Sequence, residues 1–423
     1  MSTTFAHLSQ PQCWGLVLLS AGIALSRAAG LAQVSALLSS ILGEKEQTVF
    51  QRLREWYLDK EQKTGYKRGK KRAELEVTTC FAPLCAWICR LQVWKSSEKP
   101  PLALALDATT LRNRWSILVG SVLVAGSAIP VAWKVLAFEE PGSWRPYWEK
   151  MLDLLGPSIP ADWEVIVLTD RGLYARWLWQ AIRREGWHPF LRINIGSKAR
   201  EVGTESFYWL SHWVSTPGTH WQGRMECFVS KESRLEATVL LHWEVGYADP
   251  WIILTDLPEQ QASIAWYRLR AWVEAGFKDF KRGCWGWQQS KMIRASEVER
   301  FWLAMSLAQL WCLSLGSQSE NREEKERGPL PVQHIACRSR RRPIGERGPR
   351  RLSCVLRGHL VLLALQFHGK EFSLGCLYPD RWPEVLLPPQ KPTTKKKAGR
   401  SPSSREHRRK TKRRAALRAK ALR

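Results

Sequence analysis

The sequence predicts an α/β fold built on one mixed sheet, and a change in hydrophobic periodicity carries this prediction. Between Cys13 and about Leu91 the apolar residues recur at helical spacing. After Lys99-Pro100-Pro101 they gather instead into short runs typical of strands, with helical segments between them. Three strands, a helix, a strand, a helix and a strand make an α/β layout with a single sheet.

Residues 1–95 are predicted to form an all-helical DNA-binding region, in which Leu16, Leu19 and Ile23 begin the helical pattern. A basic run from Lys63 to Arg72 follows the helices. It contains glycines that let the backbone approach a phosphate and a tyrosine that can stack on a base. The run is interpreted either as a DNA-contacting loop or as a solvated linker, and both interpretations stay open.

Residues 100–200 are predicted to hold the first part of the sheet. The expected elements, in chain order, are strands 102–106, 115–124 and 129–138, helix 146–155, strand 165–168, helix 173–185 and strand 190–195. The uncharged stretch 115–133 is long enough to cross a bilayer, but Gly120, Gly126 and Pro130 interrupt it. We therefore expect two buried strands in a hairpin, turning at Ala125-Gly126-Ser127, and no membrane segment.

The later part of the chain divides into four regions by composition. They are a β-rich insertion at 201–258, the second part of the core at 259–318, a C-terminal region at 319–390 and a basic tail at 391–423. The expected elements are strands 225–229, 237–243 and 251–255, a long helix from Ser263 to about Leu315, and an apolar helix from Leu352 to about Phe367. The last helix is interpreted either as a contact between subunits or as packing within the chain.

The charge of the chain indicates a polyanionic partner. Its 423 residues carry 65 Lys and Arg against 39 Asp and Glu, a formal charge of +26. Each cation placed on a phosphate releases condensed counterions, so nucleic acid is the default partner. The last 33 residues, from Lys391, hold 15 Lys or Arg and one acid, so we expect a disordered, electrostatic tail. The rest of the chain still carries +12.

The ten cysteines include no Cys-x-x-Cys pair, which argues against a zinc or redox site. They are interpreted as reduced packing residues of a cytosolic protein.

Two aspartates end apolar strands. Asp107 follows Leu102 to Leu106, and Asp170 follows Val165 to Thr169. A carboxylate in this position is costly to desolvate unless it is paired or binds a cation. Two adjacent strands that end in acids can therefore converge on one metal ion.

A third acid, Glu274, lies on a helix face with four other polar residues. At about 100° per residue, the five side chains project within about 80° of one another. They are Tyr267, Arg270, Glu274, Lys278 and Lys281. An exposed pair at i and i+4 explains only part of this pattern, and one acid among a phenol and three cations suits phosphate and metal better.

This pattern resembles the Tyr-Arg-Glu-Lys signature of DDE transposases of the fourth insertion-sequence family and its close relatives. Tyr267, Arg270, Glu274 and Lys281 match at the spacing of that family. Leu104-Ala105-Leu106-Asp107-Ala108-Thr109 resembles its first-aspartate strand, and Leu168-Thr169-Asp170-Arg171-Gly172 its second. The resemblance covers residues 100 to 315. One departure is Ala271, where many relatives carry a tryptophan.

The resemblance implies an RNase H-like core in which Asp107, Asp170 and Glu274 are catalytic and hold two Mg²⁺ or Mn²⁺ ions. Oxygen ligands and a hard cation agree with the lack of a His or Cys cluster. The implied phosphate-binding residues are Tyr267, Arg270, Lys278, Lys281 and, on the strand at 190–195, Arg192. Trp285 and Trp287 either stack on bases or pack within the protein.

The function implied is cut-and-paste transposition on double-stranded DNA. The protein would bind terminal inverted repeats, cleave at the transposon ends and join the 3′ ends to target DNA, acting as a homodimer on DNA. The expected location is the nucleoid of a prokaryotic cytoplasm. An inactive DNA-binding remnant and a nuclease on the same fold are the alternatives.

Overall fold

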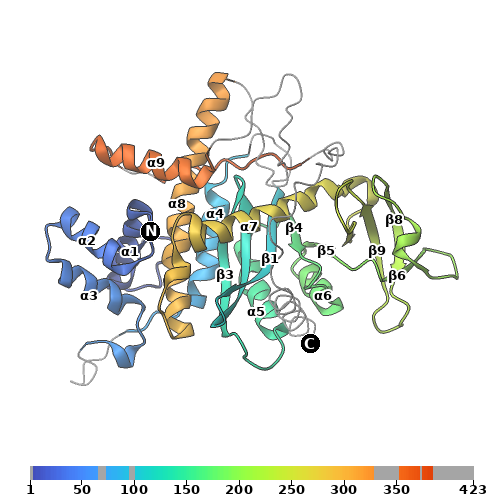
Figure 1. The fold of residues 1–423 in the computed structure, drawn as a ribbon, viewed down its shortest axis with the longest axis horizontal. Coiled ribbons are helices and arrows are strands. Elements are labelled where there is room, and N and C mark those ends of the chain that lie inside the picture. Colours follow the sequence, from blue (N-terminus) through green and yellow to red (C-terminus); the bar gives the residue numbers. More distant parts are fainter. Residues whose placement is uncertain (1–2, 65–72, 95–100, 328–351, 372–373, 384–423) are drawn as a thin grey trace, which may run out of the picture.

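The computed structural model describes residues 3–64, 73–94, 101–327, 352–371 and 374–383 (Figure 1). Most of the basic run from Lys63 to Arg72 and the whole tail at 391–423 lie outside these residues, so the expectations for them stay predictions.

Ten strands form the sheet. They are β1 (Pro101–Leu111), β2 (Trp115–Val124), β3 (Ser127–Ala137), β4 (Glu164–Thr169), β5 (His188–Arg192), β6 (Lys198–Glu201), β7 (Tyr208–Trp209), β8 (His220–Cys227), β9 (Leu235–His242) and β10 (Trp251–Thr255). Strands β6 and β7 had no counterpart in the sequence analysis, because they have only four and two residues and so lack a strand pattern.

The described residues also form α-helices. They are α1 (Gln10–Ser26), α2 (Leu31–Leu42), α3 (Glu46–Tyr57), α4 (Phe81–Leu91), α5 (Arg145–Leu155), α6 (Arg176–Arg184), α7 (Ala271–Lys278), α8 (Ala295–Arg327) and α9 (Cys354–Phe367). A 3₁₀ helix, η7 (Ile264–Arg270), precedes α7, and a π-helical turn, η8 (Asp279–Gly283), follows it.

The sheet is mixed, as predicted. Its strand order is β3-β2-β1-β4-β5-β10-β9-β8-β6-β7. The pairs β1–β4 and β4–β5 are parallel, and the other pairs are antiparallel. This mixed sheet flanked by helices is consistent with an RNase H-like fold. The β-rich insertion extends the same sheet, because β10 pairs directly with β5.

The apolar stretch at 115–133 forms the predicted hairpin. β2 and β3 pair through Val124 and Ser127, and the two residues between them, Ala125 and Gly126, both have positive φ angles, of 49° and 74°. Such a two-residue turn matches the twist of the paired strands. Every residue of β2 is buried, which explains why the sequence is apolar on both faces of this strand.

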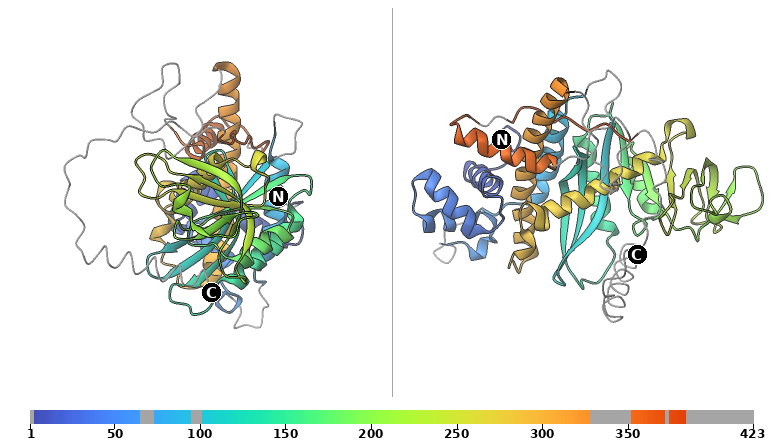
Figure 2. Two further views of the ribbon diagram at one scale, coloured as in Figure 1. Left: turned by 90° about the vertical axis from the view of Figure 1, so that its right-hand side faces the viewer. Right: turned by 45° about the horizontal axis from the view of Figure 1, so that its top comes forward.

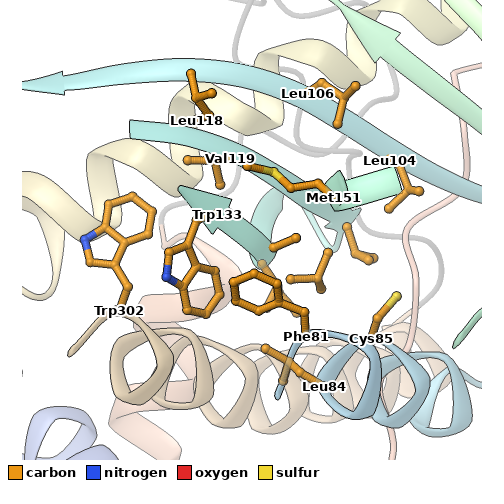
Figure 3. Close-up of a cluster of buried hydrophobic side chains, with 14 of the residues drawn as sticks. Phe81, Leu84, Cys85, Leu104, Leu106, Leu118, Val119, Trp133, Met151 and Trp302 are labelled. Atoms are coloured by element: carbon orange, nitrogen blue, oxygen red, sulfur yellow. The ribbon is translucent and has the colours of Figure 1, made fainter. Parts of the chain in front are cut away.

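Helices cover the two faces of the sheet in different ways. On one face, Leu104, Leu106 and Trp133 pack against residues of α4, α5 and α8 (Figure 3). On the other face, Ala103, Ala105 and Ala128 pack against η7 and α7. The small side chains on this second face let α7 approach the strands closely. Figures 1 and 2 show α7 crossing the strands on its way to α8.

The expected helix from Ser263 to Leu315 is wrong in one respect, because it is broken into several pieces. Residues 264–283, called the signature segment below, change from a 3₁₀ to an α and then to a π helix. Cys284 leaves helical geometry at φ −121°, Gly286 has a φ of 65°, and α8 begins only at Ala295. Helical periodicity alone does not distinguish these forms over such short stretches.

None of the helices in the described residues is, by itself, both long and apolar enough to span a membrane. Taken together, α1 and α2 would be long and apolar enough, but the chain bends by 100° between them.

Candidate active site

The backbone brings Asp107 and Asp170 to neighbouring positions. β1 and β4 pair in parallel up to Leu106 and Thr169, and the two aspartates are the next residue in each case. Alternate residues of a strand share a face. Asp107 therefore lies on the face of Ala103 and Ala105, and the continuation of β4 places Asp170 on the same face, which the signature segment covers. The predicted convergence of these two acids is thus part of the strand geometry.

The Arg270 guanidinium forms an ion pair with Asp107, with 2.8 Å between Arg270 Nη2 and Asp107 Oδ2. The two side chains are only 13% and 16% exposed, so solvent screens the pair weakly. The second oxygen of Asp107 accepts a hydrogen bond from the Ala108 amide at 2.8 Å. Both oxygens of this carboxylate are therefore engaged.

The pKa of Asp107 is raised to about 6: burial raises it most, the nearby Arg270 charge opposes this effect, and the carboxylate of Asp170 adds to it. Burial also disfavours the charged form of Arg270. The net effect is a raised pKa of Arg270, because four nearby groups stabilise its charged form by more than burial disfavours it. These groups are the carboxylates of Asp107, Asp170 and Glu274 and the Tyr267 hydroxyl. Arg270 is thus the positive group that all three acids stabilise electrostatically.

Tyr267 supports the end of β4 from within the core. Its side chain is buried, and its hydroxyl donates a hydrogen bond to the Thr169 carbonyl at 3.1 Å, one residue before Asp170. Burial raises the pKa of this phenol, which keeps it a donor. The Arg192 guanidinium lies 5.8 Å from the centre of the Tyr267 ring. Arg192 also donates to the Pro250 carbonyl at 3.2 Å, so it connects β5 to the loop before β10.

Tyr267 and Arg270 share one side of the segment for a reason different from the one expected. Both belong to the 3₁₀ helix η7, in which residues three apart are aligned along the axis. The angle of 100° per residue assumed for the whole pattern holds only in α7, which carries Glu274 and Lys278. Both of these side chains are exposed.

Lys281 reaches β1 from the π-helical turn. Its Nζ donates to the Thr109 hydroxyl at 2.5 Å, two residues after Asp107 on the same face of the strand. The amine also lies 5.9 Å from the centre of the Phe277 ring. A π turn widens the helix by one residue, and here it brings a basic side chain to the edge that holds the acids.

A buried polar cluster holds this turn in place. Asp279 is 8% exposed, and its Oδ2 accepts hydrogen bonds from Ser127 at 3.2 Å and from Gln309 at 3.4 Å. Cys284 Sγ lies 3.6 Å from the other oxygen. Burial raises the pKa of Asp279. The cluster joins the β2–β3 hairpin, the π turn and α8, and the sequence analysis missed it because its members lie far apart along the chain.

Gly276 was also missed. A Cβ atom at this position would lie 2.8 Å from Ala128 Cβ and 2.9 Å from the Ala128 carbonyl oxygen. Only glycine therefore allows α7 to lie this close to β3. A glycine in the middle of an expected helix was the available signal, since it costs stability unless packing requires it.

The tryptophans beyond the signature pack within the protein. Trp285 and Trp287 are each 1% exposed, and Trp285 Nε1 donates to the Gln309 side chain at 3.1 Å. Of the nine cysteines in the described residues, seven are buried, in line with their interpretation as packing residues.

The possible metal ligands of this site are the carboxylates of Asp107, Asp170 and Glu274. Carboxylate oxygens suit Mg²⁺ or Mn²⁺. In the described part of the chain, however, no three His, Cys, Asp or Glu side chains are arranged to hold a metal ion. Asp107 and Asp170 lie side by side, but Arg270 and not a third acid contacts Asp107. The chemistry of the donors fits a hard cation, whereas their arrangement in this structure does not.

Residues 143–311 match the family model described as the transposase DDE domain. The matched residues include Asp170 and the whole signature segment, while Asp107 precedes them. No curated protein matches the sequence.

Proposed function

Because residues 143–311 of this chain match the transposase DDE domain, we propose that the protein catalyses cut-and-paste DNA transposition. In this proposal it binds the terminal inverted repeats of its element, cleaves the DNA at their ends and joins the 3′ ends to target DNA. Members of the family depend on divalent metal ions. The match does not specify the fourth insertion-sequence family, which stays a prediction.

One observation carries the proposal beyond the family match. The strand that precedes the matched region delivers Asp107 to the edge where Asp170 and the signature segment meet. A residue before the match and residues within it therefore lie close together, which supports the proposal of one shared site. Asp107, Asp170 and Glu274 are the proposed ligands of two Mg²⁺ or Mn²⁺ ions, which would activate the attacking oxygen and stabilise the leaving one.

The basic side chains are assigned by their accessibility. Lys278 is exposed and Lys281 lies at the edge, so both are proposed to contact DNA phosphates. Arg270 can hold two phosphate oxygens with its planar guanidinium. Tyr267 and Arg192 are engaged with the protein, and a direct role in DNA binding would require exchange of the contacts to Thr169 and Pro250.

Joining two ends requires two active sites, so a dimer on DNA is part of the proposal. α9 packs on α8 through Gly316 and Gly358, and it leaves Leu360, Leu363 and Phe367 exposed. Both interpretations of this helix thus remain compatible with the structure.

The deciding experiment uses the purified chain and duplex DNA from the borders of its gene, with Mg²⁺, with Mn²⁺ and with EDTA. We expect cleavage only with a divalent ion. Glu274→Ala should abolish cleavage and retain binding, because Glu274 is exposed and its loss leaves the buried core intact. The control is Glu236→Ala, an exposed acid in the insertion that pairs with Arg224. Binding without cleavage by the unmodified chain would indicate an inactive remnant, and cleavage without joining would indicate a nuclease.

A further inference from the structure

The disagreement between the donor set and its arrangement has a local cause, which is the position of Arg270. Its guanidinium lies 2.8 Å from Asp107 Oδ2 in a weakly exposed environment. The carboxylates of Asp170 and Glu274 also act on it electrostatically. Arg270 therefore balances part of the negative charge of the three acids, which a divalent ion would otherwise balance.

Arg270 and a divalent ion at Asp107 exclude each other on physical grounds. Asp107 Oδ1 accepts a hydrogen bond from the Ala108 amide and Oδ2 is bound by Arg270, so a cation at either oxygen would lie within a few ångströms of the guanidinium. Two positive groups within a few ångströms in a partly buried site repel each other strongly. A metal ion can therefore bind Asp107 fully only when the guanidinium moves away.

The Arg270 side chain is only partly bonded within the described residues. It lies at the junction of η7 and α7, and its Nε is buried without a hydrogen-bond partner in the described residues. Tyr267, three residues earlier, is fixed by its bond to the Thr169 carbonyl. A rotation of the Arg270 side chain would thus free Asp107 while the strand ends keep their positions.

We infer that Arg270 couples metal binding to DNA binding: it holds Asp107 in the DNA-free protein, and a DNA phosphate that draws the guanidinium away frees the carboxylate for a divalent ion. The inference rests on the proposed function for the identity of the anion. Such coupling is reciprocal: if bound DNA raises the affinity of the protein for the metal ion by some factor, the bound metal ion raises the affinity for DNA by the same factor.

The test measures Mn²⁺ binding to the full chain without DNA, by electron paramagnetic resonance of the free ion and by the Mn²⁺-dependent shift of the thermal unfolding midpoint. Arg270→Ala should bind Mn²⁺ more tightly than the unmodified chain, by about 5- to 150-fold. Arg270→Lys should lie between the two, because lysine keeps the charge but lacks the planar fork. Adding Asp107→Asn to Arg270→Ala should remove the gain.

The matched control is Arg282→Ala, which removes an exposed arginine of the same segment whose Nε donates to the Gln288 side chain. A gain in this variant equal to that of Arg270→Ala would reduce the effect to general charge and overturn the inference. The inference also fails if neither Arg270 variant binds Mn²⁺ more tightly. Arg270→Lys retains a cation beside Asp107, so it provides the answer if the alanine variant does not fold.

A second arm adds duplex DNA from the borders of the gene. DNA should tighten Mn²⁺ binding by the unmodified chain and have little effect on Arg270→Ala. Tightening of equal size in both proteins would contradict the coupling. The two proposals can be distinguished by their failures. If DNA and Mn²⁺ binding are coupled through Arg270 but the chain never cleaves DNA, the transposase proposal is wrong and the role of Arg270 stands.

Discussion

The signature segment and α8 follow each other in the chain and cover opposite faces of the same sheet, but they are built differently. α8 is one continuous helix of 33 residues, and its residues 298–317 are almost all buried. The signature segment has three helical forms within 20 residues and exposes Glu274 and Lys278. The regular helix supplies packing, and the irregular one supplies the positions of individual side chains.

Both helices use glycine to approach a neighbour, which makes the comparison testable. Gly276 brings α7 against Ala128 of β3. Gly316 brings α8 against α9, where a Cβ atom would lie 2.0 Å from the Cys354 carbonyl oxygen. Added volume at either position should cost stability, but only at Gly276 should it move the site.

The largest effect is expected for Gly276→Val. Overpacking against Ala128 should cost about 1–3 kcal/mol in the free energy of unfolding. A displacement of α7 by about 1 Å should lower the cleavage rate about 10²-fold, since catalysis depends on that alignment. Urea unfolding and cleavage per folded molecule measure the two effects. Gly316→Ala is the control, with lost stability and unchanged cleavage per folded molecule. Equal loss of cleavage in both variants would mean that packing alone decides activity.

The next effect concerns α8, through the buried Arg300. This side chain donates to the Tyr57 and Leu75 carbonyls and forms ion pairs with Asp59 and Glu74. Arg300→Ala leaves these groups unpaired and should lower the free energy of unfolding by about 3 kcal/mol. Arg294→Ala, whose side chain is 46% exposed, should cost less than about 1 kcal/mol. Urea unfolding of both variants gives the comparison, and similar costs would contradict the buried network.

Much of this contrast could be predicted from the sequence. Apolar runs identified β1 to β5 and the hairpin, because strand periodicity and the turn at Ala125-Gly126 are local signals. The adjacency of Asp107 and Asp170 also followed, since each comes directly after the stretch in which β1 and β4 pair. The expectation that a strand ends at Asp107 was wrong, because β1 continues to Leu111 by pairing with β2. The division of residues 263–315 into 3₁₀, α and π pieces did not. It depends on contacts such as Asp279 with Ser127 and Gln309, which no local pattern reveals.

The pairing of Arg270 with Asp107 was also beyond the sequence. The pattern placed both residues in one site, but it assigned Arg270 to a phosphate and Asp107 to a metal ion. Which groups meet in the DNA-free protein depends on the balance of burial and charge among Asp107, Arg270 and Asp170, which only the assembled site sets.

A smaller effect follows from the raised pKa of Asp107. Burial raises it to about 6, with Arg270 opposing and Asp170 assisting. The folded protein thus holds this proton more tightly than the unfolded chain, so the associated stability is present at pH 4 and is lost as the pH rises through 6. Asp107→Asn should lack this loss, which amounts to roughly 3 kcal/mol at most. Urea unfolding at pH 4 and pH 8 measures it, relative to the unmodified chain. A difference that moves in the opposite direction would contradict the raised pKa.

The smallest effect separates two lysines that the sequence placed on one face. Lys281 contacts Thr109 beside the acids, whereas Lys278 is exposed on α7. Lys281→Ala should therefore lower cleavage about tenfold more than Lys278→Ala at saturating DNA. Both variants should weaken DNA binding by similar amounts, and each should reduce the slope of log K against log salt by about 1 if it removes a phosphate contact. Equal cleavage by the two variants would contradict this prediction, because it would mean that the contact between Lys281 and Thr109 of β1 does not contribute to the reaction.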